Sequence, residues 1–390
     1  MTSERGFAAA DYTSPWIDDE MRALGETAAR FCAEEMVPHL AEWEAQQHVD
    51  RDLWHRAGKQ GLLCCSIPET YGGGGGTYAH DLVVFQEQAR SGQSGWGNSV
   101  HSGIVAHYIL AFGTEEQKQR WLPAMASGDL VAAIAMSEPG AGSDLQSIAT
   151  RAVKDAEGYR ISGSKTFISN GAQADLVIVV VKTDPTAGAR GISLIGVEVE
   201  KCSGFRRGRI LEKIGAHSAD TSELFFDDAW VPEANLLGGV EGQGFVQLME
   251  HLPQERLVVA LSAVTMAEMA VEQTIAYTRQ RQVFGKPLFD KQNTRFELAE
   301  CATLAHVGRV FVDSCITRHL QGDLDTSTAA MAKYWLTDIQ GQVIDRCLQL
   351  HGGYGYMREY PIARMYEDAR VSRIAGGSNE VMKELIARTL

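Results

Sequence analysis

The sequence has few cysteines and no arrangement of them that would hold a metal or a disulfide framework. Its 390 residues contain seven cysteines without a CxxC pair, and the only close couple is Cys64 and Cys65. Disulfide scaffolds and zinc sites both need closely spaced cysteines. The eleven histidines show no metal-ligand spacing either. We therefore expect a protein without a bound metal, in a reducing compartment.

Positive charge and long apolar runs are also scarce. The net charge is −14, which argues against nucleic-acid binding because that needs a basic face. No stretch reaches the roughly 18 apolar residues of a membrane span. Residues 1–12 lack the basic and apolar segments of a secretory signal. We expect a cytoplasmic protein of bacterial type with no membrane span.

Motifs of hydrolytic enzymes and nucleotide-binding loops are missing. The chain contains no His-Glu-x-x-His and no Gly-x-Ser-x-Gly. The five glycines 72–76 lack the Gly-Lys-Ser/Thr ending of a phosphate-binding loop, and the pattern there predicts a surface loop. Hydrolase and metalloenzyme functions therefore have no candidate site.

What the sequence does contain is a change of pattern along the chain. Residues 17–31 carry apolar side chains at helical spacing, and similar windows follow at 79–92, 99–112 and 114–126. Short β-branched runs then recur at 131–136, 159–169, 176–181, 191–197 and 221–226. Long helical stripes return at 245–275, 290–321 and 325–350. The pattern predicts a mostly α member of the α+β class: an all-helical domain (1–129), a middle β domain (130–240) and a C-terminal helix bundle (241–390).

The most informative segment is the turn that follows the first predicted strand. Residues 133–144 read AIAMSEPGAGSD, in which a proline and two glycines remove side chains and fix a tight backbone course. Backbone groups and the hydroxyls of Ser137 and Ser143 are then free to face a ligand, and a flat polar ring would fit there. An ordinary β-turn between strands is the alternative.

With four further motifs, this segment resembles the acyl-CoA dehydrogenase family over nearly the whole chain. The motifs are Gly163–Gly171 (GSKTFISNG), Arg281–Gly285 (RQVFG), Gln349–Gly353 (QLHGG) and Gly376–Glu380 (GGSNE). Within the family the chain looks most like the long-chain enzymes, through residues 101–105, 252–256 and 359–363. The resemblance implies a fold with a β-barrel-like middle domain and a C-terminal four-helix bundle, and FAD as cofactor in a homotetramer.

The same resemblance assigns two groups of FAD-binding residues. The first lies in the middle domain and comprises Ile134, Met136, Ser137, Gly142, Ser143, Phe167, Ile168 and Ser169. Phe167 offers an apolar face to the flavin and Ser169 a hydroxyl, where the family commonly has Trp and Thr. The second group is C-terminal, is used partly across a subunit boundary, and comprises Arg281, Phe284, Gln292, Gln349, Gly352, Gly353, Ser378 and Glu380. The planar guanidinium of Arg281 can donate two parallel hydrogen bonds, which suits the pyrophosphate of FAD.

The expected catalytic base is Glu255. Much of the family has a Glu where this chain has Gly376, whereas long-chain and isovaleryl-type members carry the base on the long helix, which here gives Glu255. Glu255 and Arg256 lie about 100° apart on a helix, so they cannot form a simple surface pair. The alternative is that these two residues lie on a solvent-exposed face of the helix.

Substrate binding is expected from neighbouring residues. Gly376 would keep a backbone N–H for the thioester carbonyl, a donor of the oxyanion-hole kind. Pro253 should distort the long helix beside the base and leave room for an acyl chain. Ser143, Arg256 and Gly377 complete the expected substrate site.

The resemblance therefore implies dehydrogenation of an acyl-CoA to a trans-2-enoyl-CoA, with an electron-transferring flavoprotein as oxidant. Two alternatives remain open. One is an isovaleryl-like dehydrogenase of branched acyl groups, and the other is a non-catalytic homologue that binds flavin or acyl-CoA.

Overall fold

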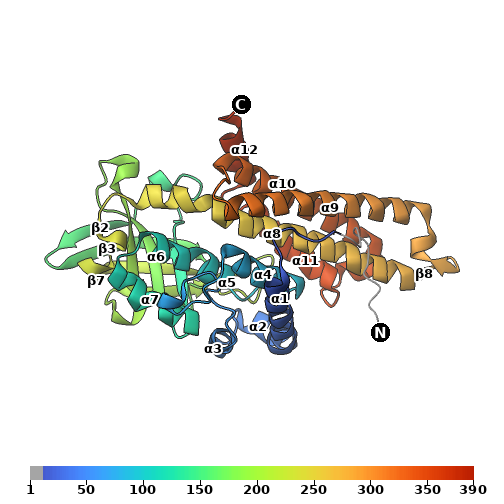
Figure 1. The fold of residues 1–390 in the computed structure, drawn as a ribbon, viewed down its shortest axis with the longest axis horizontal. Helices are drawn as coiled ribbons and strands as arrows, with labels where there is room; N and C mark the ends of the chain where they lie inside the picture. Colours follow the sequence, from blue (N-terminus) through green and yellow to red (C-terminus); the bar gives the residue numbers. More distant parts are fainter. Residues whose placement is uncertain (1–11) are drawn as a thin grey trace.

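The computed structural model describes residues 12–390 and has, in chain order, a helical part, a sheet and a second helical part. In the elongated molecule the sheet lies at one end, and the long C-terminal helices run to the other (Figure 1). The N-terminal stretch inspected for a signal peptide lies almost entirely outside the described residues. The order of the three parts confirms the fold class that the sequence predicts.

The first part is made of short helices around an aromatic core. Its α-helices are α1 (Asp19–Phe31), α2 (Leu40–Gln46), α3 (Arg51–Lys59), α4 (Tyr78–Arg90), α5 (Asn98–Val100), α6 (Ala106–Phe112) and α7 (Glu115–Ser127). Thr114 caps α7 as predicted, since its hydroxyl accepts from the N–H of Gln117. Two π-helical segments, η1 (Cys32–Met36) and η4 (His101–Val105), interrupt the α-helical course.

The middle part is one curled seven-stranded sheet. Its strands are β1 (Ala132–Ala135), β2 (Arg151–Asp155), β3 (Gly158–Ile168), β4 (Leu176–Lys182), β5 (Ile192–Glu198), β6 (Phe205–Ile210) and β7 (Ser222–Pro232). The strand order is β1-β4-β2-β3-β7-β6, and β5 pairs with β4. One face closes over a core of its own, and the other packs on α6 and α7 through residues such as Trp121 and Tyr108.

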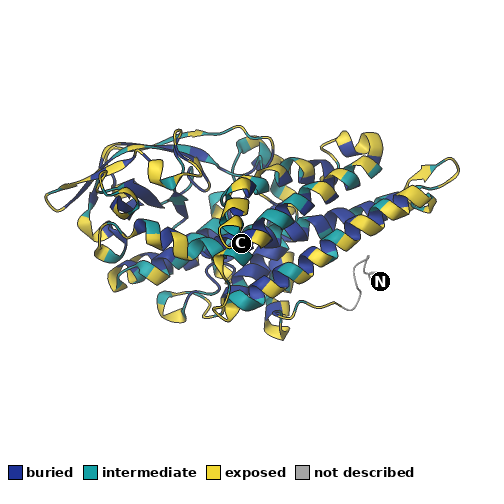
Figure 2. Cartoon of the chain, turned by 90° about the horizontal axis from the view of Figure 1, so that it is seen from above, coloured by how far each residue is buried: buried dark blue, intermediate teal, exposed yellow. Residues whose placement is uncertain are grey.

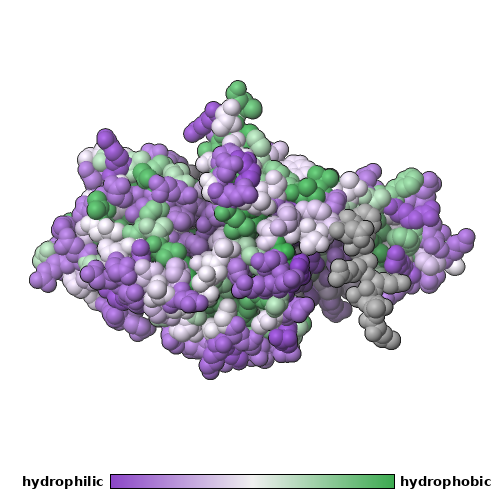
Figure 3. Space-filling model, viewed as in Figure 1, coloured by the Kyte–Doolittle hydropathy of each residue, from purple (hydrophilic) through white to green (hydrophobic). Residues whose placement is uncertain are grey.

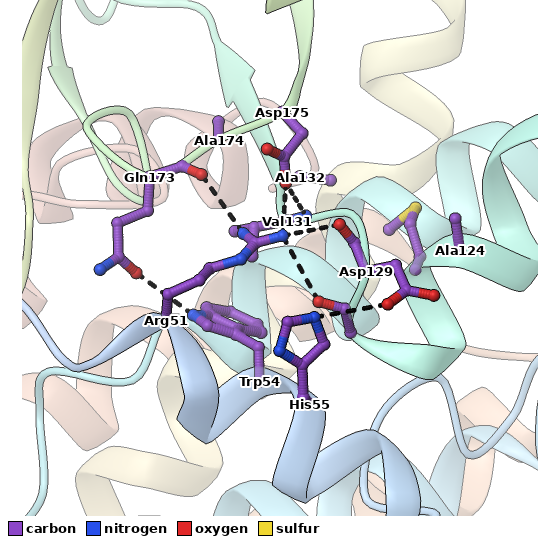
Figure 4. A network of polar contacts seen from close by, with 12 residues as sticks. Arg51, Trp54, His55, Ala124, Asp129, Val131, Ala132, Gln173, Ala174 and Asp175 are labelled. Atoms are coloured by element: carbon purple, nitrogen blue, oxygen red, sulfur yellow. Dashed lines mark hydrogen bonds and ion pairs between the residues drawn. The ribbon is translucent and has the colours of Figure 1, made fainter.

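A polar junction fixes the start of β1 against the N-terminal helices (Figure 4). Arg51 on α3 donates to the carbonyl oxygen of Asp129 at 2.7 Å and to the carboxylate of Asp175 at 2.7 Å. The same carboxylate accepts from the N–H of Val131 at 2.7 Å. Since β1 leads directly into the Pro/Gly turn, this junction sets the position from which the turn departs.

The last part contains three long helices and two short ones: α8 (Gly244–Gln280), α9 (Gln292–Leu320), α10 (Thr326–His351), α11 (Pro361–Ala369) and α12 (Asn379–Ala387). A small hairpin, β8 (Gln282–Val283) with β9 (Lys286–Pro287), joins α8 to α9 and protrudes at the far end of the molecule, where it is exposed (Figure 2). α8 continues through Pro253 without a break.

By length and composition, α8 alone among the described helices could cross a membrane. An 18-residue window of it has a mean hydropathy of 1.3, and 67% of that window is buried inside the protein. Its apolar side chains pack on α4, α9 and α10, with Leu257, Leu261 and Val264 in the shared core. The high mean hydropathy of α8 therefore follows from its central position in the fold.

Candidate active site

The Pro/Gly turn is held rigidly by a buried ion pair. The carboxylate of Glu138 accepts from the N–H groups of Ala149 and Thr150 and from Nζ of Lys165, the last at 2.8 Å. Lys165 also donates to the carbonyl of Met136 at 3.0 Å. Hydrogen bonds to this lysine and to backbone amides lower the pKa of Glu138 despite its burial. Glu138 is thus fully engaged in holding the turn.

Beside this turn, β3 ends in an exposed aromatic residue with a left-handed backbone. Phe167 has φ +62° and its side chain is 69% exposed, which is unusual for a large apolar group. Ser169 and Ser143 are exposed, and their hydroxyls have no partner among residues 12–390. The side chain of Ile168 packs into the sheet core, so its backbone is the part that can meet a ligand.

Glu255 is a buried carboxylate whose side chain has one hydrogen-bond partner among the described residues. The hydroxyl of Tyr108 donates to its Oε1 at 2.8 Å, and both side chains are buried. Burial raises the pKa of Glu255 to about 7, opposed by the Tyr108 hydrogen bond and the charge of Arg256. A carboxylate with this pKa is poised to accept a proton near neutrality.

The solvated-face alternative for Glu255 and Arg256 is wrong, since both residues are buried. Arg256 leaves its Nε and Nη1 without a hydrogen-bond partner among the described residues. Burial lowers its pKa, against the opposing charge of Glu255. A buried guanidinium with two free donors is equipped to meet a polar group of a ligand.

The loop 374–378 lies against the same part of α8. A Cβ built on Gly376 would lie 3.6 Å from Cγ2 of Val259, and the N–H of Gly376 donates to no acceptor within residues 12–390. Lys333 on α10 holds this loop through the carbonyl of Gly377 at 2.6 Å and Oδ1 of Asn379 at 3.0 Å. Burial and the charge of Arg256 lower the pKa of Lys333 to about 8.

Ser378 and Glu380 start α12. The hydroxyl of Ser378 accepts from the N–H of Val381, as the N-cap prediction requires. Glu380 is exposed in the first helical turn, where the backbone and Ser378 lower its pKa. No hydrogen bond joins it to Glu255 or Tyr108, which bond to each other.

The second predicted group, apart from Ser378 and Glu380, gathers at the opposite end of α8. Arg281 follows the last residue of α8 and lies over the ring of Tyr354 at 5.6 Å, which brings it beside Gly352 and Gly353. Phe284 at the hairpin tip is 97% exposed, and Gln292 opens α9. Gln349 is exposed in the last turn of α10.

His351 in the same region is a structural residue. Its ring stacks on Tyr277 with centroids 4.2 Å apart, and its Nδ1 contacts the carbonyl of Cys347 at 2.9 Å. Burial lowers its pKa, so it stays neutral near pH 7.

Arg281 lies too far from Glu255 for one ligand to reach both residues within one chain. At about 1.5 Å per residue, α8 carries Arg281 about 40 Å away from Glu255. That span exceeds one extended FAD molecule. Any dinucleotide bound both beside Glu255 and at Arg281 must lie between two copies of the chain.

Sequence reasoning missed Tyr108 and Lys333. Each reaches its partner across a long separation in the chain, 147 residues for Tyr108 and Glu255 and 44 for Lys333 and Gly377. No local motif marks either one. The only available signal was a polar group at a predicted buried helical position.

Family models for the acyl-CoA dehydrogenase N-terminal, middle and C-terminal domains match residues 18–129, 133–229 and 242–390. The chain is 50% identical over 367 residues to the mitochondrial long-chain specific acyl-CoA dehydrogenase of Sus scrofa, covering 94% of this chain and 85% of that protein. A solved acyl-CoA dehydrogenase from Geobacillus kaustophilus is 48% identical with a TM-score of 0.95, covering 97% of this chain and 99% of that one. An acyl-CoA dehydrogenase complexed with FAD from Bacillus anthracis is 30% identical with a TM-score of 0.88, covering 98% of this chain and 68% of that one.

Proposed function

The chain belongs to the acyl-CoA dehydrogenase family, and we propose that it is an FAD-dependent enzyme that converts long-chain acyl-CoA thioesters to trans-2-enoyl-CoA with Glu255 as its base. The observation that carries this proposal is the buried carboxylate of Glu255, with a pKa of about 7, on the helix turn that faces Gly376. The 50% identity to a long-chain enzyme supports the chain length.

The chain's own residues handle the proton and the carbonyl. Glu255 takes the proton from Cα while FAD, when bound, accepts the hydride that leaves Cβ. The free N–H of Gly376 donates to the thioester oxygen and so stabilises the charge that develops on it. Burial of Glu255 excludes water from the base and raises its proton affinity.

The residues present fit FAD. The exposed face of Phe167 and the unpartnered hydroxyls of Ser143 and Ser169 suit an apolar ring with polar edges. The exposed guanidinium of Arg281 suits a pyrophosphate. Because these groups lie at opposite ends of α8, we propose that each FAD lies between two subunits.

An apolar surface supports assembly into a homotetramer. It lies on α9 and α10 and consists of Val307, Val310, Phe311, Met331, Tyr334 and Trp335. Figure 3 shows apolar patches among the hydrophilic residues along this edge. Exposed apolar surface of this kind marks a protein contact. For the electron acceptor, we propose an electron-transferring flavoprotein.

Anaerobic mixing with acyl-CoA substrates tests the proposal. The FAD-loaded enzyme should lose its flavin absorbance with saturated long straight-chain acyl-CoA, with smaller rates for short and branched chains. Fastest bleaching by isovaleryl-CoA would assign the branched-chain alternative. Binding of acyl-CoA without any bleaching would assign the non-catalytic one.

A further inference from the structure

The catalytic carboxylate is approached by one hydrogen-bond donor among the described residues. Tyr108 on α6 donates to Oε1 of Glu255 at 2.8 Å, and no other hydrogen bond reaches that side chain within residues 12–390. The ring of Tyr108 is held between His251, with centroids 4.9 Å apart, and Phe112, at 6.0 Å. Tyr108 is therefore fixed in place, and within the described part of the chain its hydroxyl donates to Glu255 alone.

The ring of Tyr108 lies in an apolar cluster that extends to the Pro/Gly turn. Ile134 and Met136, at the end of β1, pack against this cluster. The hydroxyl end of the Tyr108 side chain touches Glu255. The cluster that holds the Tyr108 ring thus reaches the turn expected to line the flavin, while its hydroxyl meets the group expected to take the proton.

We propose that Tyr108 is a positioning residue for the base: its hydroxyl holds Oε1 of Glu255, favours the ionised carboxylate, and leaves Oε2 as the oxygen that accepts the α-proton. This inference rests on the proposed function. In the step, an Oε2–H bond forms as the Cα–H bond breaks. The electron pair of that bond becomes the Cα–Cβ double bond, and the hydride leaves Cβ for FAD.

The hydrogen bond from Tyr108 has two opposite effects on Glu255 as a base. A donor to a carboxylate stabilises the charged form, so Tyr108 increases the fraction of base that is ionised near neutrality. The same stabilisation weakens the carboxylate as a proton acceptor. Tyr108 itself stays neutral, because burial and the nearby carboxylate raise its pKa well above 10.

Four other titratable groups near the base each keep largely one charge state between pH 5.5 and 7.5. Burial and the charges of His107 and His319 lower the pKa of His251 to about 4, so its ring is neutral above pH 5.5. Tyr78 on α4 stays neutral because burial raises its pKa well above 10. Arg256 stays charged, and Lys333, which faces Arg256 from α10, has a pKa of about 8. Among these groups, Glu255 is the one whose pKa lies inside the range from pH 5.5 to 7.5.

The test is Tyr108→Phe in the FAD-loaded enzyme, with flavin reduction by a long-chain acyl-CoA followed in a single anaerobic turnover. Loss of a hydrogen bond to a charged group should move the inflection of the pH–rate profile upward by about one pH unit or more. The variant should then be about tenfold slower than wild type at pH 6, with the gap closing toward pH 7.5. A profile that is unshifted, or lowered equally at every pH, would overturn the proposal.

A matched control and a second replacement separate this role from packing. Tyr159→Phe removes a hydroxyl that donates to the carboxylate of Glu241 at 2.7 Å in the middle domain, away from the base, and should leave the inflection unchanged. Placing 3-fluorotyrosine at position 108 keeps the shape but strengthens the donor, so the inflection should move downward. An upward shift or none would contradict the proposal even where Tyr108→Phe fails to fold.

The outcome is distinct from a failure of the proposed function. If Glu255→Gln reduces its flavin at the wild-type rate, then Glu255 is not the base. If Glu255→Gln is inactive but neither replacement at position 108 shifts the inflection, only the role of Tyr108 is lost.

Discussion

Gly376 lies against Val259, one helical turn beyond Glu255 on α8. A Cβ at Gly376 would be 3.6 Å from Cγ2 of Val259, an ordinary van der Waals contact. The backbone of Gly376 has φ +67°, so a side chain there is strained but has room. A carboxylate placed on this loop therefore enters the space that Glu255 serves from the helix.

The first prediction follows from this relationship. Gly376→Glu in a Glu255→Gln background should restore part of the flavin reduction, with a changed preference for chain length. Gly377→Glu is the matched control, because a Cβ there would point toward Cε of Met382 at 2.7 Å, whose side chain would have to move, and not toward Val259. Equal recovery of flavin reduction in both double variants would contradict this prediction, because it would show that the position of the carboxylate on the loop does not matter.

The second prediction concerns the base alone. Glu255→Gln keeps the shape and the Tyr108 contact but removes basicity, so flavin reduction by acyl-CoA should slow roughly 10²–10⁴-fold with FAD content unchanged. Glu380→Gln, at an exposed carboxylate expected to serve FAD, should weaken FAD binding before it slows flavin reduction in the FAD-loaded enzyme. Rapid bleaching in Glu255→Gln would exclude this residue as the base.

The third prediction links the pKa of Glu255 to stability. Its pKa is raised to about 7 in the folded protein, so the neutral carboxyl is favoured in the fold and the stability that this gives is lost as pH rises through 7. Glu255→Gln should therefore raise the Tm relative to wild type at pH 8, and by much less at pH 5. Thermal unfolding at the two pH values measures this difference. Glu380→Gln should show no such gain at pH 8, because the pKa of Glu380 is lowered.

The fourth prediction concerns Arg281. Arg281→Ala should release FAD and weaken subunit assembly together, because this guanidinium is expected on a neighbour's cofactor. The flavin-to-protein absorbance ratio and sedimentation velocity measure the two effects. Lys286→Ala removes another exposed cation from the same hairpin and should change neither. Full flavin content in Arg281→Ala would refute the shared cofactor site.

The helices and most strands follow from sequence periodicity, whereas elements without a strong pattern do not. β2 and β6 carry many polar side chains, and only their pairing with β3 and β7 identifies them as strands. The first group of predicted residues does gather around the turn. The separation of the two groups depends on the 37-residue length of α8, which the pattern indicates. The burial of Arg256 could not be predicted, because it depends on the packing of α10 and its Lys333.

The π-helical segment His101–Val105 has a consequence for the direction in which Tyr108 points. A π-helical turn holds one residue more than an α-helical turn, and each residue advances a helix by about 100°. Deleting one residue from this segment would turn Tyr108 by about that angle, away from α8. The carbonyl of Gly103, which the bulge leaves available, is secured by Tyr78 and Gln254 at 3.2 and 3.1 Å. The extra residue of this π-helical turn thus directs the Tyr108 hydroxyl toward the Glu255 carboxylate. A helical wheel drawn from the sequence assumes a regular α-helix and therefore does not show this direction.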